Sequence, residues 1–214
     1  MWKDVERGFQ VAFEAAWSAY QAGTIPIGAS CILNEHEEVV VVSRNQIFAG
    51  GAGLISFHQL AHAEINAILQ ISEMTTPNLH ANIRQYTLYT TMEPCPLCFG
   101  AIVMGSIRFV KYAARDRWAG AVALNEALGY IQRKRISVEG PFAEGEIVQI
   151  AMQVCMDLAR ENPAEFVIDC FNEDCPEGVA IGRRLRKSGA LERLAKQGVD
   201  IAEVYDFILN MKEA

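Results

Sequence analysis

The sequence EPCPLC at residues 93–98 places two cysteines three positions apart, directly after a proline, and AHAE occurs upstream at residues 61–64. A CxxC pair alone is compatible with a redox dithiol, half of a structural zinc site or part of a catalytic one. A redox dithiol has no need of AHAE, and a structural zinc needs a fourth closely spaced Cys or His, which the sequence does not offer. The combination therefore favours a catalytic metal site.

Three residues, His62, Cys95 and Cys98, match the ligand set of a catalytic zinc. Such a site has three protein ligands and an open position for water. The two cysteines are expected at the start of a helix, where their sulfurs share one face and the helix N-terminus favours thiolates. With His62 at the start of a second helix, the sequence predicts one Zn²⁺ per chain.

Glu64 is predicted to be the catalytic proton carrier and not a fourth ligand. Two residues along a helix turn through about 200°, so Glu64 should not share the direction of His62. A carboxylate beside the metal, but not bound to it, suits proton transfer to and from the attacking water. The combination of H-x-E with P-C-x-x-C is the signature of zinc-dependent base deaminases.

Hydrophobic periodicity predicts an alternation of helices and strands. The predicted elements are a first helix ending at Gly23, a hairpin (25–33 and 39–43), a helix (61–72), a strand (86–91), a helix (Pro94 to about Gly105), a strand (107–114), a short helix (about 119–128), a strand (135–140) and a long helix (141–162). This order requires a mixed sheet with helices on both faces. Residues 1–162 are predicted to form the catalytic domain.

Residues 163–214 are predicted to form a further, mostly helical extension. Its apolar residues recur in helical phase, so it should pack on the catalytic domain or on a partner chain. We hypothesise that it helps to close the pocket and restricts the enzyme to small substrates. The alternative is an appendage that serves stability or dimerisation.

Composition narrows the range of partners and locations. The 214 residues are 51% hydrophobic and 21% charged, which is typical of a globular protein, and the formal charge of -7 does not favour an extended nucleic-acid interface. No apolar run has the length of a membrane helix, and the charged N-terminus does not resemble a signal peptide. We expect a cytoplasmic protein with reduced thiols and no membrane partner.

Five motifs occur in an order that resembles the cytidine deaminase-like superfamily, especially its guanine deaminases and tRNA adenosine deaminases. They are PIGA (26–29), RNQ (44–46), AHAEINAI (61–68), LYTTMEPCPLCFGAI (88–102) and VKYAARD (110–116). The resemblance covers about residues 1–160. It implies a three-layer α/β/α sandwich with a five-stranded mixed sheet, a water-activating zinc, hydrolysis of an exocyclic amine to a carbonyl with release of ammonia, and a homodimer.

The resemblance also implies substrate contacts. Asn45 matches the asparagine that hydrogen-bonds the base, Ala63 would offer its backbone N–H, and Ala29 lies where the first strand meets the ring. His58 lies in a stretch that departs from the purine-side pattern, and it is either a substrate contact or an exposed loop residue. Glu126 is either an acceptor for a purine or a solvated helix-end carboxylate.

A guanine-type free base or nucleoside is the favoured substrate. The alternatives are adenosine in tRNA, which requires a positive groove around the zinc, and a cytosine-type nucleoside or nucleotide, because HAEINAI also resembles the pyrimidine-nucleotide branch. Two basic clusters, at 132–135 and 183–187, are the only sequence features that favour RNA. A non-catalytic zinc module is the least favoured reading, because structure alone does not require Glu64.

Overall fold

The fold is built around one mixed five-stranded sheet, described by a computed structural model for residues 1–33, 35, 37–51, 53–74 and 83–212. The strands are β1 (Gly28–Leu33), β2 (Glu38–Arg44), β3 (Tyr86–Met92), β4 (Phe109–Ala114) and β5 (Ser137–Glu139). Their order in the sheet is β2-β1-β3-β4-β5. β1 runs antiparallel to both of its neighbours, whereas β3, β4 and β5 are parallel.

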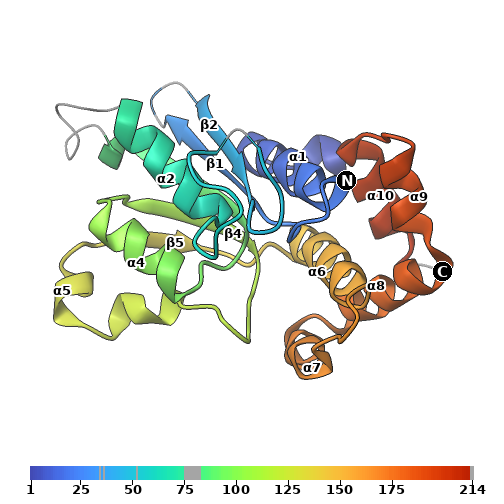
Figure 1. Ribbon diagram of the computed structural model, residues 1–214. Coiled ribbons are helices and arrows are strands. Elements are labelled where there is room, and N and C mark those ends of the chain that lie inside the picture. The colour runs from blue at the N-terminus through green and yellow to red at the C-terminus, as the bar shows by residue number, and fades with distance from the viewer. Residues whose placement is uncertain (34, 36, 52, 75–82, 213–214) are drawn as a thin grey trace.

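Helices cover both faces of this sheet, which confirms the three-layer α/β/α prediction (Figure 1). The helices are α1 (Arg7–Gln21), α2 (Ala63–Met74), α4 (Pro96–Met104), α5 (Gly129–Gln132), α6 (Ala143–Asp157), α7 (Glu165–Asp174), α8 (Pro176–Ser188), α9 (Ala190–Lys196) and α10 (Ile201–Asn210). α1 and α6 pack on one face, and α2 and α4 on the other. Strand residues alternate accordingly: Leu88 belongs to the core under α2 and α4, and Tyr89 to the core under α1 and α6.

Two predicted helices differ from those observed. The short helix expected at about 119–128 is replaced by a turn, the 3₁₀-helix η3 (Val122–Glu126) and α5. The long helix ends at Asp157 instead of 162, and Pro163 follows, which disfavours helical backbone before it. The predicted order of strands and of the remaining helices in the first 157 residues agrees with the structure.

The C-terminal helices share one apolar core with α1 and α6. Residues of α7 to α10 that are buried in this core are Ile168, Phe171, Val179, Ile181, Leu185, Leu191, Ile201, Val204, Tyr205, Ile208 and Leu209. α8 lies along α6, and α10 contacts α1 and α6 (Figure 1). The expectation that the extension packs on the catalytic domain is therefore met within a single chain. Among the described residues, no helix has the length and apolar character needed to cross a bilayer.

Candidate active site

The first turns of α2 and α4 bring the predicted zinc ligands together. His62 directly precedes α2, Cys95 is the N-cap of α4, and Cys98 lies in the first turn of α4. His62 Nδ1 is 3.7 Å from Cys95 Sγ and 3.4 Å from Cys98 Sγ. The three potential ligand atoms all lie within 4.8 Å of one another, and no fourth acidic, Cys or His side chain of the described residues joins them.

The electrostatics of these groups favour a bound cation. A hydrogen bond from Cys98, together with one to His62, lowers the pKa of the Cys95 thiol to about 4. The hydrogen bond to Cys95 and burial raise the pKa of Cys98. The hydrogen bond with Cys95 raises the pKa of His62. Two thiols and an imidazole thus compete for protons in one small volume, and a divalent cation would satisfy all three in their metal-binding forms.

The donor set fits zinc. Two sulfurs and one imidazole nitrogen are typical ligands of Zn²⁺ at catalytic sites, where the fourth position stays open. His62, Cys95 and Cys98 would hold the ion, and its chemistry there would be to activate water as a nucleophile near neutral pH. Besides the hydrogen bond with Cys95, the backbone of Gln59 contributes to the raised pKa of the imidazole.

Glu64 lies beside these residues but is not grouped with them. It is 3% exposed, and its two carboxylate oxygens accept from Thr90 Oγ1 at 3.0 Å and from Cys98 Sγ at 3.3 Å. Burial raises the pKa of the carboxyl above its usual value. The rotation argument from sequence does not hold, because His62 precedes the helix and is not bound by helical spacing to Glu64. The resulting place, beside the cysteine sulfur, suits a proton carrier.

The chain segments that carry Asn45, Ala63 and Ala29 meet near the start of α2. Ser43, the sheet partner of Ala29, donates to the Ala63 carbonyl, and Gln46, which follows Asn45, donates to the Ala61 carbonyl. Asn45 is buried, and its Oδ1 accepts from Thr24 Oγ1 at 2.8 Å and from the Ile47 N–H at 3.0 Å. Its amide nitrogen has no hydrogen bond to any described residue, so it remains available as a donor. Ala63 is the first residue of α2, where backbone N–H groups have no intrahelical partner. Ala29 is buried and pairs in the sheet with Thr90, the residue that holds Glu64.

Within the described residues, the side chains of His58 and Glu126 form no hydrogen bond with Asn45 or Ala63, the predicted substrate contacts near the start of α2. His58 is exposed, and its Nδ1 accepts from the backbone N–H of Leu60 at 3.1 Å, as a turn residue does. Glu126 is exposed at the end of η3, and its carbonyl accepts from Gln132. Neither side chain lines either of the two cavities beside the loop after β4, whose walls include Met92 and Glu93. Their substrate roles stay predictions without geometric support.

Sequence reasoning missed the acids that shape the loop after β4. Glu93 is buried, and its carboxylate accepts from the backbone N–H groups of Asp116 and Val122, both at 3.2 Å. Asp116 Oδ1 in turn accepts from the N–H groups of Trp118 and Ala119 at 3.1 and 2.9 Å. The position of Glu93 in EPC, two residues before a predicted ligand, was the available signal.

Comparison with known proteins identifies the family. Residues 3–114, more than half of the chain, match the cytidine and deoxycytidylate deaminase zinc-binding region. The chain is 26% identical over 174 residues to the cytosine deaminase of Candida albicans, covering 81% of this chain and 98% of that protein. It is 29% identical over 114 residues to the tRNA-specific adenosine deaminase of Rickettsia typhi, covering 53% and 71%.

A solved structure of a protein in complex with 2,6-diaminopurine superposes with a TM-score of 0.53 at 20% identity, covering 71% of this chain and 81% of that one. This likeness supports the fold. The family match, together with the converging ligands, shows that the chain belongs to the cytidine and deoxycytidylate deaminase family and is a zinc-dependent hydrolytic deaminase.

Proposed function

We propose that the protein deaminates a small free base or nucleoside and not a base within a polynucleotide. The supporting observation is helix α7, which walls a cavity of about 240 Å³ beside the zinc-ligand loop. The cavity lies between Ile27 and Met92 of the sheet, Trp118 of the loop after β4, and Val167 and Phe171 of α7. Two residues of its lining link the cavity to the site: burial and the nearby Cys95 thiolate raise the pKa of the Asp116 carboxyl, and the Ile27 carbonyl accepts from the Asn45 N–H at 2.9 Å. We infer that the cavity opens toward the metal centre.

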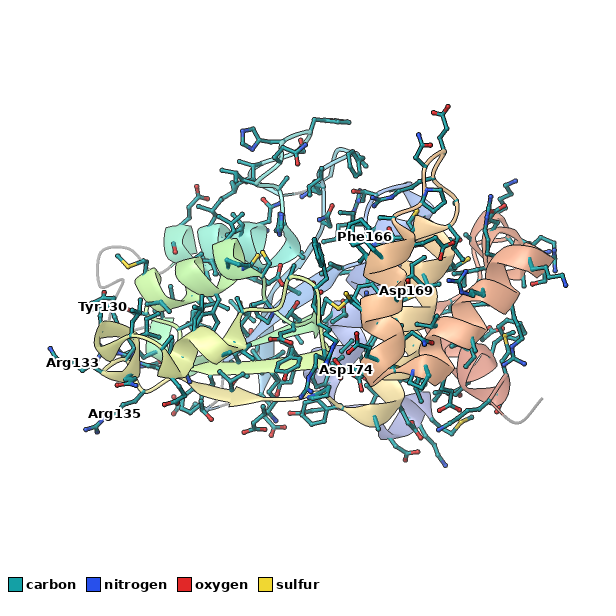
Figure 2. All side chains as sticks on the ribbon, turned by 90° about the horizontal axis from the view of Figure 1, so that it is seen from below. Tyr130, Arg133, Arg135, Phe166, Asp169 and Asp174 are labelled. Carbon is teal, nitrogen blue, oxygen red and sulfur yellow. The ribbon has the colours of Figure 1, made fainter. Side chains whose placement is uncertain are left out.

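Two neighbouring residues of the loop after β4, Arg117 and Trp118, contact α7. The rings of Trp118 and Phe166 meet edge to face with centroids 4.9 Å apart. Arg117 forms ion pairs with Glu173 at 2.7 Å and with Asp174 at 3.1 Å. Figure 2 shows Phe166 and Asp174 on α7, so the loop is held at both ends of this short helix. The ring contact contributes most to holding this wall, because Arg117 and Glu173 are largely exposed and such ion pairs are weak. We infer that the wall leaves room for one ring and obstructs a folded RNA.

The basic clusters offer little to RNA. In the cluster at 183–187, Arg183 pairs with Glu165, and Arg186 with Glu192. In the cluster at 132–135, Arg133 and Arg135 are exposed, but they lie with α5 at the end of the molecule remote from α7 (Figure 2). Phosphate contacts dominate nucleic-acid affinity. Of these cations, Arg183 and Arg186 are paired with carboxylates, and Arg133 and Arg135 are distant from the α7 wall.

The proposed chemistry uses the buried carboxylate twice. Glu64 takes a proton from the attacking water and gives it to the ring, and a second proton goes to the departing amine. The new C–O bond forms first, as the ring nitrogen takes up its proton. The second proton then comes from the added hydroxyl and the C–N bond breaks, so one water is consumed, one ammonia leaves, and the ring keeps a carbonyl. Thr90 holds one oxygen of Glu64 in place during both transfers, and Asn45 can donate to a ring acceptor.

Two rings are candidates. The match to the cytosine deaminase favours a cytosine-type ring. It covers 81% of this chain, so even a match that starts at residue 1 extends into α7, the helix that lines the cavity. The sequence favours a guanine-type ring, with Glu126 as an acceptor for the purine. Glu126 is exposed at the surface, so the geometry gives this role no support. We therefore place cytosine-type substrates first and guanine-type substrates second.

We further propose that the protein is a homodimer. Three apolar side chains are exposed on the helices of one layer: Leu69 of α2, and Leu97 and Met104 of α4. Exposed apolar side chains on neighbouring helices are typical of an isologous interface. Sedimentation at micromolar concentration tests this, and a monomer would contradict it. The boundary between a catalytic domain (1–162) and the extension (163–214) stays a proposal.

Substitution tests the wall better than truncation, because α7 to α10 contribute to the core. Phe166→Ala removes an exposed ring that packs on Trp118, a residue that lines the cavity, and should leave folding intact. If α7 restricts the cavity to small rings, the variant should accept bulkier N-substituted bases that the wild type rejects. Phe207→Ala, an exposed ring on α10, is the matched control. An unchanged substrate range in Phe166→Ala would contradict the proposed wall.

A further inference from the structure

Helix α6 carries three polar side chains in a row where it crosses the core. Gln149, Gln153 and Asp157 are spaced four residues apart, so they share one face of the helix. They are 0%, 7% and 7% exposed, among otherwise largely apolar neighbours. Buried polar groups in such surroundings cost free energy unless they have partners. Neither the zinc ligands nor Glu64 account for them.

Both amides are only half satisfied. Gln149 Nε2 donates to the Pro26 carbonyl at 2.9 Å, and Gln153 Nε2 donates to Asp157 Oδ2 at 2.9 Å. The Oε1 atoms of both glutamines are buried and accept no hydrogen bond. An acceptor kept in this state is explained by a donor that arrives later, a ligand group or a water molecule.

Of the two amides, that of Gln153 lies at the cavity under α7. Gln153 and Asp157 line the 240 Å³ cavity under α7, and Gln149 does not. Asp157 Oδ1 is 3.2 Å from the guanidinium of Arg160, a side chain that is 45% exposed and so a weak partner. A carboxylate accepts more than two hydrogen bonds. The cavity thus has two neighbouring acceptors, and its other walls include the apolar side chains of Met92 and Trp118.

Turning the amide of Gln153 toward a ligand rotates a soft terminal torsion and breaks its hydrogen bond to Asp157, whose Oδ2 then becomes available to the same ligand. Asp116, which also lines the cavity, already accepts from two backbone N–H groups. The unfilled acceptor capacity therefore concentrates at Gln153 and Asp157. Such a site selects a ligand with an N–H or O–H donor in preference to an anion.

We propose that Gln153 and Asp157 bind the hydrogen-bond donor that the substrate carries at its glycosidic position. The inference rests on the proposed function, in which the reacting amine lies at the metal centre and the far side of the ring enters the cavity. In a free base this donor is the ring N–H. In a ribonucleoside it is supplied by the sugar hydroxyls. Gln153 and Asp157 are binding residues in this account, and they take no part in bond breaking.

Matched substrate pairs separate the two sources of the donor. 1-Methylcytosine lacks the ring N–H of cytosine and keeps the reacting amine, and 2′-deoxycytidine lacks one hydroxyl of cytidine. The corresponding purine pairs are guanine with 9-methylguanine, and guanosine with 2′-deoxyguanosine. The test compares kcat/KM of the wild-type, zinc-loaded full chain within each pair. In either the free-base pairs or the nucleoside pairs, the compound that carries the donor should have a kcat/KM roughly tenfold higher. No preference within any pair would overturn the proposal.

The variants Gln153→Met and Gln149→Met complete the test. Both remove a buried amide with one unfilled oxygen from the same face of α6, but only Gln153 lines the cavity. In Gln153→Met the ratio of kcat/KM between the two compounds of a pair should fall close to one, mainly through a change in KM. In Gln149→Met this ratio should stay as in the wild type. Asp157→Asn, which keeps the side-chain size, should lower the ratio in the same direction. Equal effects of the two methionine variants would overturn the proposal.

A binding measurement distinguishes failure of this inference from failure of the proposed function. If the wild type releases no ammonia from any compound, the proposed function fails. The substrate pairs can then be tested by the thermal stabilisation they give to the folded chain. Stabilisation by the donor-bearing member that is lost in Gln153→Met, and kept in Gln149→Met, would support the subsite. Equal stabilisation by both members would overturn it.

Discussion

Replacement of Glu64 by glutamine tests the proton carrier with little change in structure. Glu64→Gln keeps the size of the side chain, and Thr90 Oγ1, now 3.0 Å from Oε1, can still donate to the amide oxygen. The amide cannot take or give a proton at neutral pH. The variant should therefore fold, retain zinc and lose turnover.

The size of the loss follows from the two transfers assigned to this carboxylate. A positioned acid or base contributes roughly 10²- to 10⁴-fold, which is about 3–5 kcal/mol of activation free energy at about 1.4 kcal/mol per tenfold. Because Glu64 is the buried carboxylate beside Cys98, we expect the upper end, a loss of about 10⁴-fold in kcat. Thr90→Val, which removes one orienting hydrogen bond, should cost about 3- to 10-fold.

The assay is ammonia release under saturating substrate, with zinc content and thermal midpoint measured on the same samples. Glu73→Gln, an exposed acid on the same helix, is the control and should keep wild-type turnover. A Glu64→Gln enzyme that binds zinc and turns over within tenfold of wild type would refute the mechanism. A variant that has lost its zinc would show instead that Glu64 supports the metal.

Three further outcomes are expected. Cys98→Ser should lose most of its zinc on dialysis, because a buried serine is a poor substitute for a thiolate ligand; full zinc by elemental analysis would contradict the ligand assignment. Gly120→Ala should lower activity, because a Cβ there would collide with the Asp116 carbonyl and the Glu93 carboxyl; wild-type kinetics would show that the loop tolerates the shift. Leu185→Ala should destabilise by about 2–5 kcal/mol, because this α8 side chain is fully buried; an unchanged melting temperature would contradict a shared core.

The ligand cluster was predictable because the spacing of the two cysteines, the H-x-E motif and the ligand count of a catalytic zinc indicate the same three residues. Cys95 and Cys98 lie in one helical turn, and His62 is followed by apolar residues in helical phase, so two helix starts were expected to meet. The prediction for Glu64 included a wrong step, since it treated His62 as helical; the role of Glu64 as proton carrier stays a prediction. The location of a residue just before a helix depends on the chain outside it, which spacing does not describe.

The loop after β4 could not be predicted from local pattern. Residues 119–128 read as a helix, but the Glu93 carboxylate, brought there by the sheet, binds the backbone N–H of Val122 and holds a turn in its place. Tertiary contacts thus override local propensity at this point. The same limit applies to α7: its apolar phase indicated packing, and only the fold shows that it lies against Trp118.

The most direct test of the account is a screen for ammonia release by the zinc-loaded protein across free bases, nucleosides, nucleotides and tRNA, repeated after removal of zinc by a chelator. The account predicts release of one ammonia per ring from a free base or nucleoside, with cytosine-type compounds first, loss of the activity on chelation and its return with added Zn²⁺. Release from tRNA alone would contradict the proposed restriction to small substrates. No release from any compound by protein that holds one zinc per chain would contradict the catalytic assignment itself.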